Sequence, residues 1–155
     1  MSSLVNLFLK NAKKHKSRKA IIISDKKFIT FEALNKLSDF FVFKLQDNKI
    51  QKGDVICIAG HKEFESIALL IASLKLGIIY SFFDPNSPKK RISDIFKKCK
   101  PSAIFGDSNI KNQIQSFLKT NKTNFFRLNY QEHKNISKIK IKINNKYEFY
   151  YSEPA

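Results

Sequence analysis

The chain of 155 residues is about one domain long, and 43% of its residues are apolar, including 15 Phe, so its composition is not that of a disordered protein. Its formal net charge is +16 at pH 7, which raises the question of an anionic partner. No unbroken apolar run approaches the roughly 18 residues that a membrane span needs, so we expect no transmembrane helix.

The N-terminal third predicts a helix, a small hairpin and a second helix. Apolar residues at helical spacing predict the first helix over residues 4–12. Two apolar segments, 20–24 and 28–31, flank a short polar turn and predict an antiparallel hairpin. Thr30 is suited to cap the next helix, since its hydroxyl can accept from a first-turn N–H. The apolar stripe of that helix is Phe31, Leu34, Leu37, Phe41 and Leu45.

The middle of the chain alternates strand and helix patterns. Residues 55–60 form a short, continuously apolar segment, which is typical of a strand covered on both faces. Residues 61–77 predict a helix that ends at Gly77, because glycine adopts the left-handed conformation of a helix end. Residues 78–83 predict a second buried strand.

The last part of the chain continues the alternation. Ser87 is a candidate N-cap, with Pro88 at the first position of a helix that runs to about Lys100. The further predicted elements are a strand at 102–107, a helix at 109–119, a strand at 124–128, a half-exposed basic strand at 137–143 and an aromatic strand at 147–151. This order predicts the α/β class, with a partial Rossmann-like parallel sheet flanked by helices and joined by right-handed crossovers.

Short motifs along the chain resemble the opening of the adenylate-forming (AMP-binding) synthetases and ligases. They are Thr30–Asn35 (TFEALN), Lys52–Asp54 (KGD), Leu74–Gly77 (LKLG), Tyr80–Pro85 (YSFFDP), and Pro88 with Arg91. The Asp-Pro-x-x-Pro-x-x-Arg form is most similar to the amino-acid adenylation domains of nonribosomal peptide synthetases, ahead of acyl-CoA synthetases. The resemblance is best over residues 28–107. It implies that residues 1–155 are a single domain, a truncated N-terminal piece of an adenylation domain.

The resemblance also implies a nucleotide site that this sequence cannot build. In the family, a Ser/Thr/Gly-rich loop ending in Lys cradles the phosphates of ATP, and Mg²⁺ accompanies ATP in the complete enzyme. Such a cradle needs several converging backbone N–H groups, whereas Gly53, Gly60, Gly77 and Gly106 are each isolated. We therefore expect no catalytic, cofactor-binding or metal-binding residue in this chain. The Gly77 helix end and the Asp84-Pro85 turn are expected to be structural.

Other reactive residue types have simpler explanations. His15, His61 and His133 are widely separated and lack metal-ligand spacing. Glu63 and Glu65 lie two residues apart, so they do not share a helix face, and we interpret them as favouring the helix N-terminus. The two cysteines, Cys57 and Cys99, belong to no paired motif; together with an N-terminus that lacks the features of a signal peptide, they favour a reducing, cytoplasmic setting.

Three functions remain open at this point. The first is an N-terminal fragment of an AMP-dependent ligase, inactive alone, whose complete form works with a carrier protein. The second is an interaction module that completes a split adenylating enzyme with a separate chain. The third is a basic nucleic-acid-binding protein; this is disfavoured because Lys is dispersed along the chain and Arg, which suits bidentate phosphate contacts, occurs only at positions 18, 91 and 127.

An isolated piece of a larger domain should leave apolar side chains uncovered. Each uncovered large side chain forfeits roughly 1.5–3 kcal/mol, against a net domain stability of only about 5–15 kcal/mol. We therefore expect a marginal, partner-dependent fold. The candidate uncovered residues are Phe82, Phe83, Phe105, Phe125 and Phe126.

Overall fold

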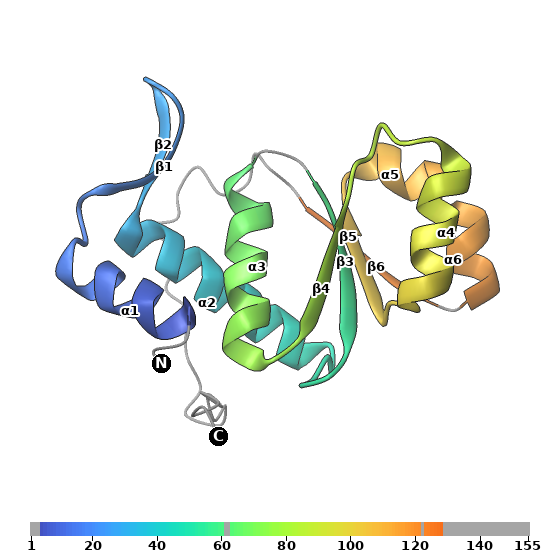
Figure 1. Ribbon diagram of the computed structural model, residues 1–155, viewed down its shortest axis with the longest axis horizontal. Helices are drawn as coiled ribbons and strands as arrows, with labels where there is room; N and C mark the ends of the chain where they lie inside the picture. Colours follow the sequence, from blue (N-terminus) through green and yellow to red (C-terminus); the bar gives the residue numbers. More distant parts are fainter. Residues whose placement is uncertain (1–3, 61–62, 122, 129–155) are drawn as a thin grey trace.

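The computed structural model describes residues 4–60, 63–121 and 123–128 (Figure 1), and the expected strands at 137–143 and 147–151 lie outside them. The described chain folds into helices and strands of the α/β class, as the sequence predicts. The helices are α1 (Leu4–Lys14), α2 (Phe31–Asp47), α3 (Phe64–Leu76), α4 (Lys89–Cys99), α5 (Ser108–Gln113) and α6 (Gln115–Asn121). The strands are β1 (Lys19–Ser24), β2 (Lys27–Thr30), β3 (Val55–Ala59), β4 (Ile79–Phe83), β5 (Ala103–Gly106) and β6 (Asn124–Arg127).

The hairpin and the second helix form as the local sequence predicts. Strands β1 and β2 pair antiparallel and form a two-stranded sheet. The next helix, α2, starts at once, because the Thr30 hydroxyl accepts a hydrogen bond from the backbone N–H of Ala33 at 3.3 Å. Four of the five predicted stripe residues of α2 are buried: Leu34, Leu37, Phe41 and Leu45.

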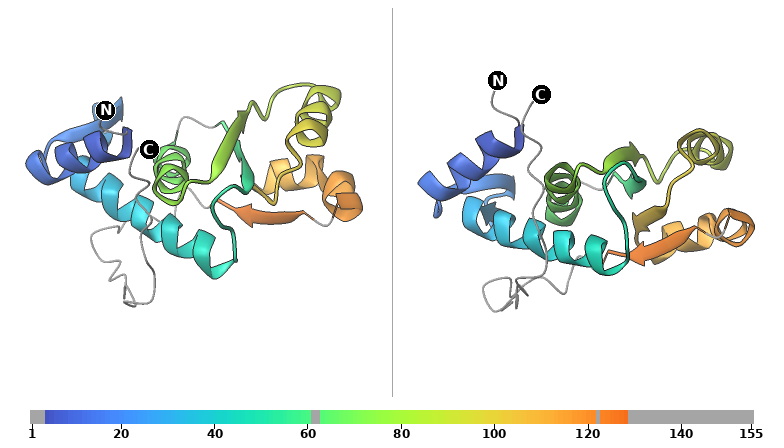
Figure 2. Two further views of the ribbon diagram at one scale, coloured as in Figure 1. Left: turned by 60° about the horizontal axis from the view of Figure 1, so that its bottom comes forward. Right: turned by 90° about the horizontal axis from the view of Figure 1, so that it is seen from below.

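Four parallel strands make the main sheet, in the order β4-β3-β5-β6. The connection from β3 to β4 runs in one direction across the sheet. The connections from β4 to β5 and from β5 to β6 run in the opposite direction. Right-handed crossovers then place α3 on one face of the sheet and α4, α5 and α6 on the other. Figures 1 and 2 show these two helical layers, with α2 running alongside α3 and α1 lying farther from the sheet.

Strand β3 is covered on both faces, which confirms the prediction from its continuously apolar sequence. Ile56 and Ile58 enter the core beneath α2 and α3. Cys57 and Ala59 enter the core beneath α4, α5 and α6. All four residues are fully buried because β4 and β5 flank β3 on either side.

Strand β4 departs from the prediction of a second fully buried strand. Ile79 is 56% exposed and Phe82 is 39% exposed, and only Phe83 is buried. The reason is topological: β4 lies at the margin of the sheet and pairs with β3 alone among the described strands. Sequence periodicity does not encode strand order, so it could not distinguish this margin from the centre.

The expected set of uncovered phenylalanines is only partly right. Phe82 is exposed, and Phe125 and Phe126 are half-buried. Phe83 and Phe105, in contrast, are buried, so their assignment to the uncovered set is wrong. Phe83 packs edge-on against Phe96 of α4, with ring centroids 5.1 Å apart, so the chain supplies this cover itself.

Two helix boundaries also differ from the prediction. Pro88, rather than Ser87, occupies the N-cap of α4, and Ser87 instead donates its backbone N–H to the Asp84 carbonyl at 3.0 Å. The segment predicted as one helix at 109–119 is two short helices that meet at Ile114. Asp107 caps the first of these through the Ile110 N–H at 2.9 Å.

Candidate functional site

Three of the family-like motifs, Thr30–Asn35, Lys52–Asp54 and Leu74–Gly77, come together where α2, α3 and the starts of β3 and β4 meet. Lys75, from the motif in α3, is 2% exposed and crosses to α2. Its ammonium donates to Asn35 Oδ1 at 2.8 Å, Ser38 Oγ at 2.7 Å and Asp39 Oδ1 at 2.6 Å. An ammonium has three donors, so Lys75 is fully satisfied by α2.

Two opposing effects act on the pKa of the Lys75 ammonium. Burial lowers its pKa, while the Asp39 carboxylate raises it, and burial is the larger of the two. The Asp39 side chain is itself partly exposed, so it keeps some hydration. A cation in these surroundings joins two helices and has no donor left for a ligand.

The second and third motifs bind each other through the backbone. Gly53 donates its N–H to the Gly77 carbonyl at 3.1 Å, and Ile79 donates to the Asp54 carbonyl at 2.8 Å. Asp54 Oδ2 accepts from the Gln51 N–H at 2.9 Å and thereby closes the turn. These contacts tie the end of α3 to the turn that precedes β3.

Glycine is required at both ends of this contact. Gly53 has a φ of +89° and Gly77 a φ of +66°, the left-handed region that residues with a Cβ rarely adopt. At Gly77 an added Cβ would also lie 3.1 Å from Lys52 Cγ. The glycines of these motifs thus serve the backbone, as expected for the Gly77 helix end.

Asp84 and Pro85 shape the exit from β4. Asp84 Oδ1 accepts from the Asn86 N–H at 2.8 Å, and its carbonyl accepts from Ser87. This Asx turn directs the chain into α4, so both acceptor sites used here serve the local backbone.

Glu63 and Glu65 lie at the start of α3, as predicted, but in different environments. Glu63 is the N-cap residue and forms an ion pair with Lys27 of the hairpin at 2.6 Å. Glu65 is only 3% exposed, and its Oε2 has no hydrogen-bond partner among the described residues. Burial raises the pKa of Glu65; a hydrogen bond from its own backbone N–H lowers it in part, Glu63 raises it further, and Lys27 lowers it. No local pattern in the sequence indicates this burial.

The two cysteines are neighbours in space although they are distant in the sequence. Cys57 of β3 lies in the core beneath α4, and Cys99 at the end of α4 packs against the same core. Burial raises the pKa of Cys57 to about 12, and Cys99 raises it too. A thiol this hard to ionise is a poor nucleophile, so Cys57 behaves as an apolar core residue.

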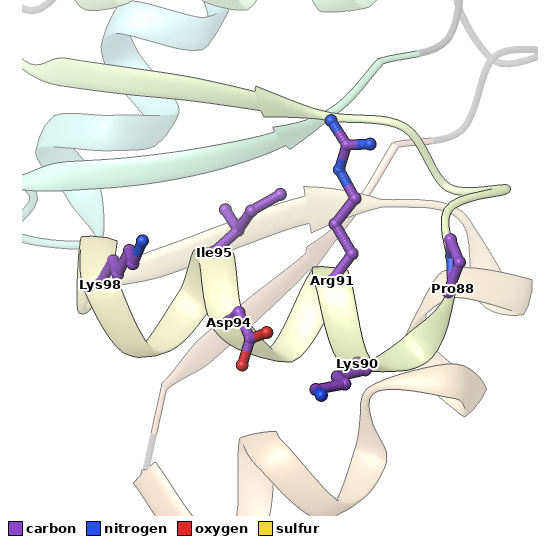
Figure 3. A pocket seen from close by; sticks show the side chains of 6 residues that line it. All are labelled: Pro88, Lys90, Arg91, Asp94, Ile95 and Lys98. Carbon is purple, nitrogen blue, oxygen red and sulfur yellow. The ribbon is translucent and has the colours of Figure 1, made fainter.

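A hollow of about 410 Å³ runs along α4 and contains the last motif residue, Arg91. Figure 3 shows Arg91 and Ile95 extending from α4 toward the strands, while Lys90 and Asp94 point away. Pro88 and Lys98 complete the lining. Three of the six lining residues are cations and one is an anion, so the hollow favours anionic groups.

Two further observations concern the described residues alone. Within residues 4–60, 63–121 and 123–128, no group of three His, Cys, Asp or Glu side chains is placed to hold a metal ion. In the same part of the chain, no helix is long and apolar enough to cross a membrane. His15 lies just beyond α1, and His61 and His133 lie outside the described residues.

The sequence matches a known family model and several curated proteins. The model described as AMP-binding enzyme matches residues 8–146. Nonribosomal peptide synthetase atnA of Emericella nidulans is 26% identical over 115 residues, which are 74% of this chain and 2% of that protein. L-proline--[L-prolyl-carrier protein] ligase of Pseudomonas fluorescens is 30% identical over 78 residues, which are 50% of this chain and 16% of that protein.

Solved structures share the fold. The luciferase-like enzyme from the mealworm Zophobas morio superposes with a TM-score of 0.73 at 23% identity, covering 82% of this chain and 31% of that one. The N-terminal subdomain of Klebsiella oxytoca NpsA superposes with a TM-score of 0.64 at 22% identity, covering 70% of this chain and 28% of that one. The chain thus spans less than a fifth of these curated relatives and under a third of these solved chains.

Proposed function

The chain belongs to the AMP-binding enzyme family, and from this premise we propose that it forms framework of an adenylate-forming enzyme rather than its nucleotide site. In this proposal the ATP phosphates and Mg²⁺ are held by polypeptide beyond these 155 residues. This chain orders the α2–α3 pair and the parallel sheet on which the rest of the enzyme is built.

One observation carries the proposal: Lys75, Gly53, Gly77 and Asp84 of the family-like motifs use their polar groups within the chain. All three donors of Lys75 are directed at α2. Gly53 and Gly77 pair through their backbones, and Asp84 closes its own turn. A residue whose polar groups are occupied in this way stabilises the fold, and exposing those groups for a ligand would cost the hydrogen bonds that it already makes.

The glycine content supports the same conclusion. A loop that cradles a triphosphate needs adjacent residues free to direct several N–H groups at one anion. The four glycines of the whole sequence are at least seven residues apart, and two of them are already committed to the turn and helix end described above.

The relatives suggest the substrate class of the complete enzyme. Their names refer to nonribosomal peptide synthesis and to the ligation of L-proline to a carrier protein. We extend this to a complete enzyme that activates an amino acid or another carboxylic acid and delivers it to a carrier protein.

A second form of the proposal is a split enzyme, in which a separate chain supplies the phosphate-binding loop. The observation that favours it is the exposed apolar margin at β4, where Ile79 and Phe82 lack cover within the described residues. Mixing the purified chain with a polypeptide that carries the Ser/Thr/Gly-rich loop should then produce adenylation that neither part shows alone.

Equilibrium dialysis with ATP and Mg²⁺, and ATP–pyrophosphate exchange with mixed amino acids, test the framework function. We expect the chain alone to retain no ATP at micromolar concentrations and to catalyse no exchange. Slow hydrogen exchange of the β3 amides in the same sample controls for folding. Micromolar retention of ATP, or exchange above the buffer level, by the folded chain would overturn the proposal.

A further inference from the structure

We propose that the open margin of β4 accepts an acidic β-strand from the polypeptide that completes the enzyme. The hollow along α4 that Lys90, Arg91 and Lys98 line, here called the basic groove, takes part in this binding. This inference rests on the proposed function and names the surface at which the completion takes place. The observations that carry it are the direction of the β4 backbone groups, the composition of the strand and the charge of the groove.

The backbone of β4 has a free side. Ile79 donates its N–H to Asp54, and Phe83 accepts from Gly60 at 2.7 Å, so both residues direct these groups toward β3. Successive residues of a strand direct their backbone groups to alternate sides. Tyr80 and Phe82 therefore direct their N–H and C=O groups away from β3, where no described strand accepts them.

The side chains of β4 lack the usual protection against strand pairing. Exposed edges commonly carry charges or proline, which discourage another strand from adding. In a chain with 27% charged residues, the segment from Ile78 to Phe83 has neither. The opposite margin is different, since β6 is only four residues long and has Asn124 and Arg127 exposed at its ends.

Exposed apolar groups mark the same margin. Ile79 and Phe82 stand on opposite faces of the sheet, and Tyr80 packs edge-on against Phe82 with ring centroids 5.9 Å apart. An added strand with apolar residues on the face of Tyr80 and Phe82 would cover these side chains and would pair with the backbone of the same two residues.

The cations that line the basic groove indicate that the partner strand is acidic. Arg91 extends from α4 alongside the carboxyl end of β4, as Figure 3 shows. Lys90 and Lys98 line the same hollow, and Asp94 is its one acidic residue. A strand that enters beside α4 is therefore favoured if it carries Asp or Glu.

The charge disfavours two other occupants. A second copy of the chain would bring together two molecules that each carry +16, and two basic grooves. In the sequence that follows the described residues, Lys138, Lys140 and Lys142 alternate with isoleucine, so this segment is also basic. Either occupant would place like charges beside Arg91.

Two peptides probe the surface directly: Glu-Val-Glu-Val-Glu-Val-Glu and Lys-Val-Lys-Val-Lys-Val-Lys. Each is added to the ¹⁵N-labelled full chain, and amide hydrogen exchange is followed residue by residue. At a concentration of the acidic peptide about ten times its Kd, we expect exchange at Tyr80 and Phe82 to slow about tenfold. The amides of β6 should be unaffected, and the basic peptide should protect neither margin.

A matched pair of variants ties the binding to β4. Ile79→Glu places a negative charge on the proposed surface, and Ile22→Glu makes the same change at a similarly exposed isoleucine of the hairpin. We expect Ile79→Glu to weaken acidic-peptide binding at least about tenfold, while Ile22→Glu leaves it within about twofold, since it lies on the separate β1–β2 sheet.

The outcomes separate this inference from the proposed function. Protection at β6 instead of β4, equal effects of the two peptides, no protection, or equal losses in the two variants would each overturn the docking surface. None of these results bears on ATP retention, which tests the framework function alone. Conversely, suppose that the chain binds ATP and that the acidic peptide still slows exchange at Tyr80 and Phe82. This result would contradict the framework function and would support the docking surface.

Discussion

Lys75 Nζ lies 2.6 Å from Asp39 Oδ1, so an ion pair with a buried cation and a partly exposed anion joins α3 to α2. Two of the family-like motifs meet at this point, because Asn35 accepts from the same ammonium. The motifs are 40 residues apart in the sequence, and the contact explains why they occur together.

Lys75→Met should destabilise the fold although it keeps the length and volume of the side chain. It leaves Asp39, Asn35 and Ser38 without their shared donor, and we expect a loss of about 1–3 kcal/mol in the free energy of unfolding, as for other buried groups left unpaired. Urea unfolding followed by circular dichroism measures it. The matched control is Lys36→Met, which breaks the exposed Lys36–Glu32 pair in α2 and should cost only about 0.2–0.5 kcal/mol. Equal losses in the two variants would contradict the structural role of Lys75.

Glu65 should make stability depend on pH in the acid range. Its folded pKa is raised above the ordinary value of 4.5, so the folded state holds a proton that the unfolded state has released. Stability from this group is therefore complete below pH 4.5 and is lost as the pH rises through the folded pKa. Glu65→Gln mimics the protonated form at every pH. We expect the Gln variant to gain stability relative to the natural chain as the pH rises above 4.5, and a pH-independent difference would rule this out.

The two cysteines should differ sharply in reactivity. Burial raises the pKa of Cys57 to about 12, so its reactive thiolate form is scarce at pH 8. Iodoacetamide should therefore alkylate Cys99 in the native chain and spare Cys57, as read by peptide mass spectrometry. In urea both should react, which serves as the control. Comparable alkylation of both thiols in the native chain would show that Cys57 is accessible.

Gly77→Ala should weaken the end of α3. The left-handed φ costs an L-residue about 1–2 kcal/mol, and the new Cβ would press on Lys52. Gly77→Asn is the companion variant, because asparagine tolerates this conformation better, and we expect it to lose less. Thermal unfolding compares the two, and an alanine variant as stable as the natural chain would show that the turn can relax.

Local signals in the sequence accounted for much of the fold. The Thr30 cap, the Gly77 helix end and the apolar run of β3 each depend on residues close together in the chain, and each appears in the structure as predicted. The N-cap of α4 differs from the prediction by one residue, because the Pro88 carbonyl accepts the hydrogen bond of the Ile92 N–H while the Ser87 N–H closes the Asp84 turn.

The remaining features depend on contacts that are distant in the sequence. A lysine within a helix ordinarily points to solvent, and the burial of Lys75 follows only from partners 36–40 residues away. The proximity of Cys57 and Cys99 requires the crossover that lays α4 over β3. The open margin at β4 requires the strand order, which no local pattern contains. The candidate docking surface could therefore be found only in the folded chain.

Large and small side chains alternate along β3, and this alternation bears on the register of β3 with its neighbouring strands. A strand with apolar residues on both faces has no polar side to fix it against a one-residue slip. Here side-chain size distinguishes the two faces: the bulky Ile56 and Ile58 lie in one core cluster, and the smaller Cys57 and Ala59 lie in the other. A slip would place the large side chains in the second cluster and the small ones in the first, so steric volume adds to the backbone hydrogen bonds that keep this central strand aligned with its neighbours.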